Sequence, residues 1–266
     1  MSAGEKKLRF CMITTFYPPY NFGGDGVYVW LLSNELARRG HSVTVIHCLD
    51  SYAALSDGSA LARYDNHPNV EVHGLKSGAG ILSPFATQQT GRPFFKSGKI
   101  KEILGEGFDV THFHNVSLIG GPAILSYGSG VKLYSIHEYW LVCPTHVLMR
   151  FGKAPCTKQS CIACQLAHAR PPQLWRYTGL LESSLRNLDA IISPSRFTKK
   201  IHEDMGVTTP IVHIPHFAVP YDGPQYENGL PANLSATGRP YFLYVGRVER
   251  LKGVHTLIPV FKDYPR

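Results

Sequence analysis

Short apolar runs that alternate with helical stretches are the feature that most constrains how this chain can fold. A first run at Leu8–Thr15 is followed by a helical pattern at 26–39 and a second run at Val43–Ile46. Further strand-like runs lie at 70–73, 110–114, 132–136, 190–193 and 211–214, and further helical patterns lie at 174–188 and 197–205. Strands that alternate with helices form βαβ units. The sequence therefore predicts an α/β fold, a Rossmann-like parallel sheet with helices on both faces.

Local signals add detail to this pattern. Asp25 is placed to cap the start of the first helix, and Gly40 stands where the chain must leave it. The segment 57–91 is rich in Gly, Ser and Ala, which predicts an irregular and mobile excursion.

A change of composition near residue 215 predicts a second domain. Residues 1–214 are predicted to form the N-terminal domain. Residues 215–240 carry five prolines and three glycines, which is typical of a linker. Residues 241–266 have the pattern of one strand and one helix, too few to bury a core alone. We therefore expect the first β-α fragment of a second α/β domain, and whether this 266-residue form is natural stays open.

Composition excludes several classes of protein. Hydrophobic residues make up 44% and charged residues 17%, which argues against disorder and against a disulfide miniprotein. No window offers the roughly 20 apolar residues of a membrane-spanning helix. The basic N-terminus imitates a signal peptide, but Phe16–Pro19 stands where a cleavage site should be. These features predict a cytoplasmic protein.

Positive charge is concentrated in one part of the chain. Of the net charge of +8, residues 132–200 supply +7, from ten Lys or Arg residues and three acidic residues. Such an excess attracts phosphates, anionic lipid surfaces or nucleic acid, or is simply a solvated basic face.

The loop between the first strand and the first helix is a candidate ligand site. Gly23 and Gly24 let backbone N–H groups at a helix N-terminus approach a phosphate or carboxylate. A plain glycine turn is the alternative. The spacing does not match a dinucleotide fingerprint, because Val29 occupies the third glycine position. Asp50 could hold a ribose, so a nicotinamide oxidoreductase stays a minor alternative.

Histidines follow the ends of two consecutive strands. Alternation places His112 and His114 on the same side of one strand, and His137 with Glu138 ends the next. A lone histidine at a strand end is usually a hydrogen-bonded core residue. Three histidines that converge on one edge of the sheet could donate hydrogen bonds to a sugar hydroxyl or a phosphate oxygen. A shared metal ion is another reading, although it lacks an obvious carboxylate.

Two cations follow the last predicted strand. Arg247 and Lys252 lie in a glycine-flanked turn and suit a diphosphate, Arg by bidentate hydrogen bonds and Lys as a point charge. An ordinary basic turn is the alternative.

Four of the six cysteines cluster in an insert at about 143–164. They are Cys143, Cys156, Cys161 and Cys164. In a cytoplasmic chain this clustering favours structural zinc over disulfides, with free or redox-active thiols and an iron–sulfur cluster as alternatives. Basic and aromatic residues in and after the insert suggest that the insert lines the acceptor side of a cleft and faces an anionic lipid carrier.

In chain order, several motifs resemble those of the retaining glycosyltransferases of family 4. They are Tyr17-Pro-Pro with Gly23-Gly24, the strand end at 109–114, the strand before His137, Ser193-Pro-Ser-Arg-Phe197 with its central Ser195, and Gly246-Arg-x4-Lys252-Gly253. The resemblance covers nearly the whole chain and implies the GT-B fold of two facing Rossmann-like domains. It also implies a nucleotide-sugar donor and a saccharide or lipid-linked acceptor. The basic insert adds the hypothesis of peripheral contact with the inner face of the membrane.

The resemblance implies roles for single residues. His137 matches the histidine that contacts the donor sugar, and Gly23 and Gly24 match the pair that lies against the donor diphosphate. Arg247 and Lys252 match the cations that neutralise the departing pyrophosphate. His112, His114, Glu138 and Ser195 are further candidates for the substrate cleft. The Glu-x7-Glu pair of the family has no counterpart in these 266 residues.

Other functions remain as alternatives. The first is a non-catalytic Rossmann-like module whose zinc-stabilised insert binds a partner, and the next is an NAD-dependent oxidoreductase. Nucleic-acid binding is not expected, because the basic excess surrounds a cysteine insert without a recognition-helix pattern. No NAD cofactor is expected either.

Overall fold

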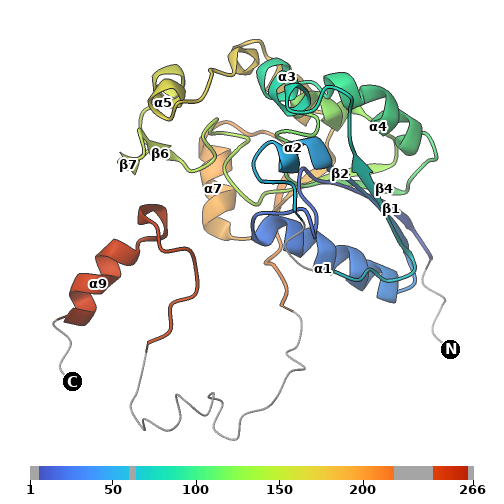
Figure 1. Ribbon diagram of the computed structural model, residues 1–266, viewed down its shortest axis with the longest axis horizontal. Coiled ribbons are helices and arrows are strands. Elements are labelled where there is room, and N and C mark those ends of the chain that lie inside the picture. Colours follow the sequence, from blue (N-terminus) through green and yellow to red (C-terminus); the bar gives the residue numbers. More distant parts are fainter. Residues whose placement is uncertain (1–5, 60–63, 219–241, 263–266) are drawn as a thin grey trace, which may run out of the picture. The chain divides into compact units, whose positions relative to one another are not determined.

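The computed structural model describes residues 6–59, 64–218 and 242–262 (Figure 1). The chain divides into two compact units, Met1–Phe217 and Ala218–Arg266, which are described separately. Within the described residues, no helix is long and apolar enough to cross a membrane.

The first unit is built on a seven-stranded sheet with the order β3-β2-β1-β4-β5-β8-β9. Every pair of neighbouring strands in it is parallel. The strands are β1 (Arg9–Ile13), β2 (Ser42–Cys48), β3 (Val70–Leu75), β4 (Val110–Phe113), β5 (Val131–Ser135), β8 (Ala190–Ser193) and β9 (Ile211–His213). The order reverses between β1 and β4, and in sheets of this kind ligands bind at such a switch point, beyond the carboxyl ends of the strands.

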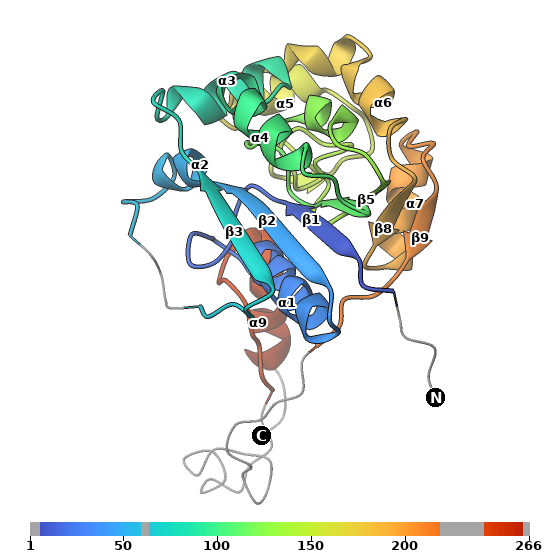
Figure 2. The same ribbon diagram turned by 90° about the vertical axis from the view of Figure 1, so that its right-hand side faces the viewer.

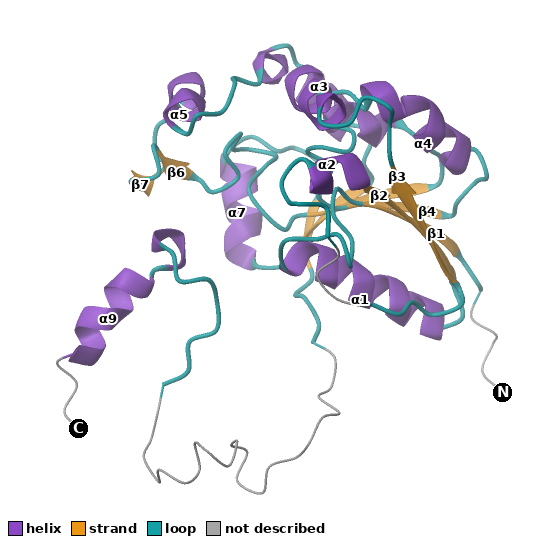
Figure 3. Cartoon of the chain, viewed as in Figure 1, coloured by secondary structure: helices purple, strands orange, loops and turns teal. Residues whose placement is uncertain are grey.

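Helices cover both faces of this sheet (Figures 2 and 3). The α-helices are α1 (Gly24–Arg38), α2 (Leu49–Ala53), α3 (Leu82–Thr90), α4 (Ser97–Leu104), α5 (Cys161–Ala167), α6 (Leu180–Leu185) and α7 (Arg196–Asp204). Short 3-10 turns are η1 (Phe94–Lys96), η2 (Pro122–Ser126) and η3 (Leu174–Tyr177). In the cysteine insert, β6 (Met149–Arg150) and β7 (Ala154–Pro155) form a small antiparallel pair.

Alternation along the strands divides the core into two layers. Met12 of β1 packs in the layer of α1 with Val29, whereas its neighbour Ile13 packs in the opposite layer with Ile100 of α4. All four side chains are fully buried. Because successive side chains of a strand point to opposite faces, one apolar run supplies both layers, which explains why the strands read as continuous apolar segments.

The predicted Rossmann-like parallel α/β fold is confirmed, and three local expectations are wrong. The helix expected at 174–188 is divided at Gly179, whose φ of +72° ends η3 before α6 begins. The segment 57–91, expected to be irregular apart from the strand-like run at 70–73, contains the helix α3 as well as β3. Asp25 does not cap α1: Gly23 is the N-cap, and Asp25 lies inside the first turn.

The second unit contains η4 (Arg250–Lys252) and α9 (Val254–Lys262). The strand expected at 241–245 does not form at residues 242–245, and residue 241 lies outside the described part. A strand needs a hydrogen-bonded neighbour, and the described residues supply none here. Most of the predicted linker also lies outside the described residues, so the predicted domain boundaries stay predictions.

Candidate functional site

The loop before α1 leaves a helix N-terminus open at the carboxyl end of β1. Gly23 is the N-cap in an extended conformation, and no side chain caps the first turn. Gly23 and Gly24 are exposed, and a Cβ added to Gly24 would meet nothing within 4 Å. Gly26 differs, because a Cβ there would lie 2.9 Å from the Cβ of Asn21. Gly26 is therefore required by packing, whereas Gly24 borders free space beside N–H groups that favour an anion.

Two histidines from neighbouring strand ends form a hydrogen-bonded pair. His114 follows β4, His137 follows β5, and the distance from His114 Nδ1 to His137 Nε2 is 3.0 Å. His114 is fully buried, whereas His137 is partly exposed. Two residues before His114, His112 lies on the same side of β4, and its Nε2 is 2.8 Å from Ser135 Oγ. The three predicted histidines thus converge at one edge of the sheet.

The hydrogen-bond network assigns the tautomers of this pair. His114 Nε2 is buried and has no partner among the described residues. A proton on Nε2 would be a buried donor without an acceptor, whereas a proton on Nδ1 is donated to His137 Nε2. We therefore assign the Nδ1–H tautomer to His114. His137 then accepts at Nε2, and its own proton lies on Nδ1, on the partly exposed ring.

Burial keeps these imidazoles neutral at neutral pH. It lowers the pKa of His137 to about 4, although the nearby Asp25 carboxylate acts in the opposite direction. Burial also lowers the pKa of His112 to about 3 and holds that of His114 well below its usual value. His137 therefore presents a neutral hydrogen-bond donor at this edge rather than a cation.

Sequence reasoning missed two residues of α1 that lie beside His137. Asp25 Oδ2 accepts a hydrogen bond of 3.3 Å from Asn115 Nδ2, which ties the first turn of α1 to the end of β4. The ring of Tyr28 lies 5.3 Å from that of His137 and 4.1 Å, stacked, from that of His216. The available signal was spacing, since residues three apart share one face of a helix.

Two predicted cleft residues have other partners in the structure. Ser195 is the N-cap of α7, and its Oγ accepts a hydrogen bond of 3.0 Å from Thr198 N. Glu138 Oε2 lies 2.7 Å from His146 Nδ1, while the other carboxylate oxygen of Glu138 is buried without a partner in the described part of the chain. Their predicted roles toward substrate stay predictions.

Asp50 is not placed to hold a ribose. Its side chain is buried, 3.2 Å from Lys96 Nζ, and accepts a hydrogen bond of 2.7 Å from Ser77 Oγ. A carboxylate engaged in a buried ion pair is not free for a sugar hydroxyl. This removes the feature on which the nicotinamide alternative depended.

The two predicted diphosphate cations lie in the second unit. Arg247 Nη2 is 3.1 Å from Glu249 Oε1, and Lys252 ends η4. Both residues belong to a unit described separately from the glycine loop and His137. Their approach to the predicted donor site stays a prediction.

The predicted zinc site is not supported. Among the described residues, which include all four insert cysteines, no group of three or more His, Cys, Asp or Glu side chains is arranged to hold a metal ion. The buried thiols have other neighbours instead: Cys143 Sγ lies 3.3 Å from Thr145 Oγ1, and Cys164 Sγ accepts a hydrogen bond of 3.3 Å from Phe151 N. Burial, together with the neighbouring cysteines, raises the pKa of Cys156 and Cys161.

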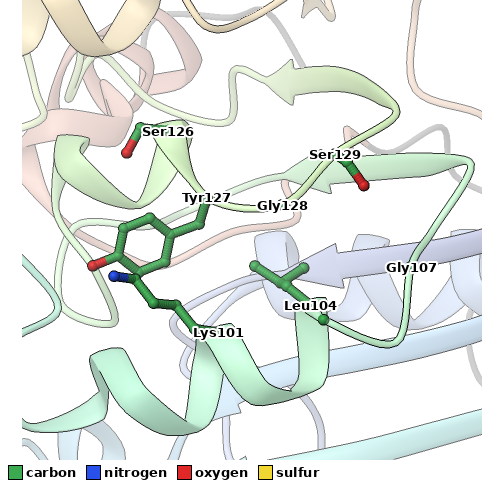
Figure 4. Close-up of a pocket in the computed structure, with 8 residues that line it drawn as sticks. Lys101, Leu104, Gly107, Ser126, Tyr127, Gly128 and Ser129 are labelled. Atoms are coloured by element: carbon green, nitrogen blue, oxygen red, sulfur yellow. The ribbon is translucent and has the colours of Figure 1, made fainter.

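A hollow of about 530 Å³ lies elsewhere on the first unit (Figure 4). It lies between Lys101 and Leu104 of α4 and the turn at Tyr127–Ser129, near the amino ends of β4 and β5. Lys101 Nζ is 4.8 Å from the centre of the Tyr127 ring. Since ligands of such sheets bind at the opposite, carboxyl ends, the histidine edge is the better candidate site.

The family model of Glycosyltransferase Family 4 matches residues 22–219 of the 266. This range includes the glycine loop, all three histidines and the cysteine insert.

Individual relatives are distant. An uncharacterised 42.6 kDa protein of the cps region of Klebsiella pneumoniae is 21% identical over 221 residues, which are 75% of this chain and 52% of that protein. TcCGT1, solved in complex with UDP, is 14% identical, with a TM-score of 0.45 over 88% of this chain and 56% of that one. The glycotransferase of kitacinnamycin is 14% identical, with a TM-score of 0.43 over 85% and 56%. The chain thus spans about half the length of these proteins.

Proposed function

Because the chain belongs to Glycosyltransferase Family 4, we propose that it is the acceptor-side part of a retaining glycosyltransferase with the GT-B fold. The reaction transfers a sugar from a nucleotide-sugar donor to a saccharide or lipid-linked acceptor. In this proposal residues 1–214 form the N-terminal domain, 215–240 the linker, and 241–266 the start of the donor-binding domain. The observation that carries it is the His114–His137 pair beside the open N-terminus of α1.

His137 would act as a neutral donor to the transferred sugar. Its Nε2 is occupied by His114, so the proton on Nδ1 is available to a sugar hydroxyl. Since His114 is fully buried, the imidazole of His137 is held in one orientation before substrate arrives. A positioned donor of this kind suits a sugar better than an imidazolium ion would, because it adds no charge that must be desolvated.

The departing diphosphate would be stabilised by two kinds of group. The uncapped N–H groups at Gly23 and Gly24 offer the positive end of α1, and Arg247 and Lys252 of the second unit supply full charges. Removal of one preorganised donor from such a site costs on the order of 3 kcal/mol in the barrier, about a hundredfold in rate. Retention would follow from front-face substitution without a glycosyl-enzyme intermediate.

The central test is the turnover of a full-length form that carries His137→Ala. We expect turnover to fall at least about tenfold, since the variant loses a positioned hydrogen bond to the sugar. His213→Ala is the matched control, because His213 is exposed on β9, outside the histidine pair. Turnover of the His137 variant within twofold of the control would remove the assigned role.

Ligand protection separates this proposal from the nicotinamide alternative. Nucleoside diphosphates should raise the thermal midpoint of the full-length protein, since a ligand that binds only the folded state stabilises it. NAD at the same concentration should not. Protection by NAD alone would contradict the proposal.

A further inference from the structure

The chain that leaves β9 returns along the carboxyl edge of the sheet to the histidine pair. Ile214 N donates a hydrogen bond of 3.0 Å to Ser193 O, at the end of β8. Two residues later, the ring of His216 is stacked 4.1 Å from that of Tyr28 and lies 5.3 Å from the ring of His137. Because β8 separates β9 from β5 in the sheet, this segment spans the end of β8 to reach the residue that follows β5.

Three aromatic rings line this edge beside His137. The ring of Phe217 lies 5.6 Å from that of Tyr28, which is itself 5.3 Å from the ring of His137. His216 and Phe217 are exposed, and Tyr28 is partly exposed. We call the rings of Tyr28, His216 and Phe217 the aromatic platform. Exposed aromatic faces at the carboxyl end of a parallel sheet offer a contact surface for a ligand.

The polar atoms of this cluster are not used by the protein. Neither the ring nitrogens of His216 nor the hydroxyl of Tyr28 make a hydrogen bond with any residue in 6–59, 64–218 or 242–262. Within the same ranges, His137 Nδ1 and Asp25 Oδ1 have no hydrogen-bond partner either. Asp25, Tyr28 and His137 are partly rather than fully buried, so these atoms are open to a ligand.

Aromatic faces combined with free polar atoms match the surface of a pyranose ring. One face of such a ring presents C–H groups of partial positive charge, which pack on the negative face of an aromatic ring. Its rim carries hydroxyl groups, each of which both donates and accepts hydrogen bonds. Beside the platform, Asp25 Oδ1 accepts, His137 Nδ1–H donates, and the Tyr28 hydroxyl does both. An apolar wall with a few convergent polar groups is the usual construction of a small-molecule site.

The platform does not offer a cation to a phosphate. In the part of the chain that the structure describes, no Lys or Arg makes an ion pair, a hydrogen bond or a cation–π contact with Asp25, Tyr28, His137, His216 or Phe217. A phosphate held here would need such a partner, whereas an uncharged sugar ring needs none. In the proposed function the donor diphosphate lies at the glycine loop, which leaves the platform for the acceptor.

We propose that the aromatic platform binds an uncharged pyranose ring of the acceptor, and that Tyr28 and His216 determine this specificity. The face of the sugar packs on the aromatic rings, and its hydroxyl groups bond to Tyr28, His137 and Asp25. The acceptor is thus recognised through a sugar ring and not through a lipid or phosphate group. The inference rests on the proposed function for the role of the ligand as acceptor, but not for the binding of a sugar.

The test is saturation-transfer difference NMR of the whole chain with simple glycosides. The probes are methyl α-D-glucopyranoside, methyl α-D-galactopyranoside and methyl α-D-mannopyranoside at millimolar concentration. We expect at least one of them to bind, with transfer strongest to the C–H protons of one face of the ring. Tyr28→Leu and His216→Leu should each weaken this binding about fivefold, since each removes an aromatic face. Tyr28→Phe keeps the ring and should lose less.

Matched variants separate the platform from a general effect. His213→Leu makes the same change as His216→Leu at an exposed histidine of β9. Tyr177→Leu makes the same change as Tyr28→Leu at a tyrosine of η3 that is 61% exposed. Both control variants should bind the glycoside as the unmodified chain does, and circular dichroism checks that every variant folds. UDP-glucose should not displace the bound glycoside, because the platform is assigned to the acceptor.

Three results would overturn the proposal: no binding of any of the glycosides, equal binding by the platform variants and their controls, or displacement by UDP-glucose. These results are distinguishable from failure of the proposed function. Glycoside binding together with normal turnover of the full-length His137→Ala form would remove the transfer reaction and leave the platform as a sugar site. Reduced turnover of that form without glycoside binding by the whole chain would remove the platform alone.

Discussion

Stability should fall steeply as the pH drops from 7 to 5, because at least four histidines at buried or partly buried positions are held neutral. Burial lowers the pKa of His47 and His137 to about 4 and that of His112 to about 3, and holds the pKa of His114 well below its usual value. The unfolded chain binds a proton at each of them near pH 6.5, so below that pH it holds more protons than the folded chain. The stability that these groups provide is therefore present above pH 6.5 and is lost as the pH falls toward 4.

The size of this effect follows from proton linkage. Each histidine that protonates only on unfolding costs about 2 kcal/mol between pH 7 and pH 5, or about 7 kcal/mol for the four together. This is comparable with the whole stability of a typical domain, about 5–15 kcal/mol. The first unit should therefore begin to unfold near pH 5, above the range in which exposed carboxylates titrate.

Urea unfolding at pH 7, 6, 5.5 and 5, followed by circular dichroism, measures this loss. His47→Gln should reduce the pH dependence by about one quarter, since one of four protons is removed. His213→Asn is the control, because His213 is exposed and should leave the dependence unchanged. A free energy of unfolding that stays within about 1 kcal/mol from pH 7 to pH 5 would refute the claim that these imidazoles are buried and neutral.

Four further predictions concern stability and turnover. Gly26→Ala should destabilise the first unit by about 1–3 kcal/mol, because the new Cβ meets the Asn21 side chain; Gly24→Ala should leave stability within about 0.5 kcal/mol but lower the turnover of the full-length enzyme, and unchanged turnover would remove Gly24 from the site. Lys96→Met should cost about 3–5 kcal/mol in urea unfolding by leaving the Asp50 carboxylate buried without its cation, and a second change at Asp50 to Asn should restore part of that loss. Ser195→Ala should cost about 1 kcal/mol through loss of the α7 cap, and a loss below about 0.3 kcal/mol would show that the cap contributes little.

The seven strands of the parallel sheet were predictable from sequence, and the helices less so. A strand buried on both faces must be apolar along its whole length, so its signal is local and strong. The helical pattern at 174–188 continued through Gly179, and the apolar spacing alone could not show that the chain turns there with a positive φ. Helix α3 was not predictable at all, because it buries Ser83 and Thr87 and exposes Leu82 and Phe85.

The convergence of histidines could be predicted, and their surroundings could not. Strand alternation and the common edge of parallel strands are enough to bring His114 and His137 together. The places of Asp25 and Tyr28 depend on how α1 crosses the sheet, and the pairing of Asp50 depends on Lys96, 46 positions later in the chain. The zinc expectation depended on cysteine spacing alone, and spacing does not show whether the thiols can surround one point.

The polar buried face of α3 and the Lys96–Asp50 ion pair are connected in the structure. Lys96 is 3% exposed, pairs with Asp50, and donates a hydrogen bond to Ser83 of α3. Because η1 is only three residues long, placing Lys96 inside leaves Phe94 and Phe95 outside. Burying phenylalanine is favourable and burying an ammonium group is costly, so this arrangement is sustained by the contacts of Lys96 with Asp50 and Ser83.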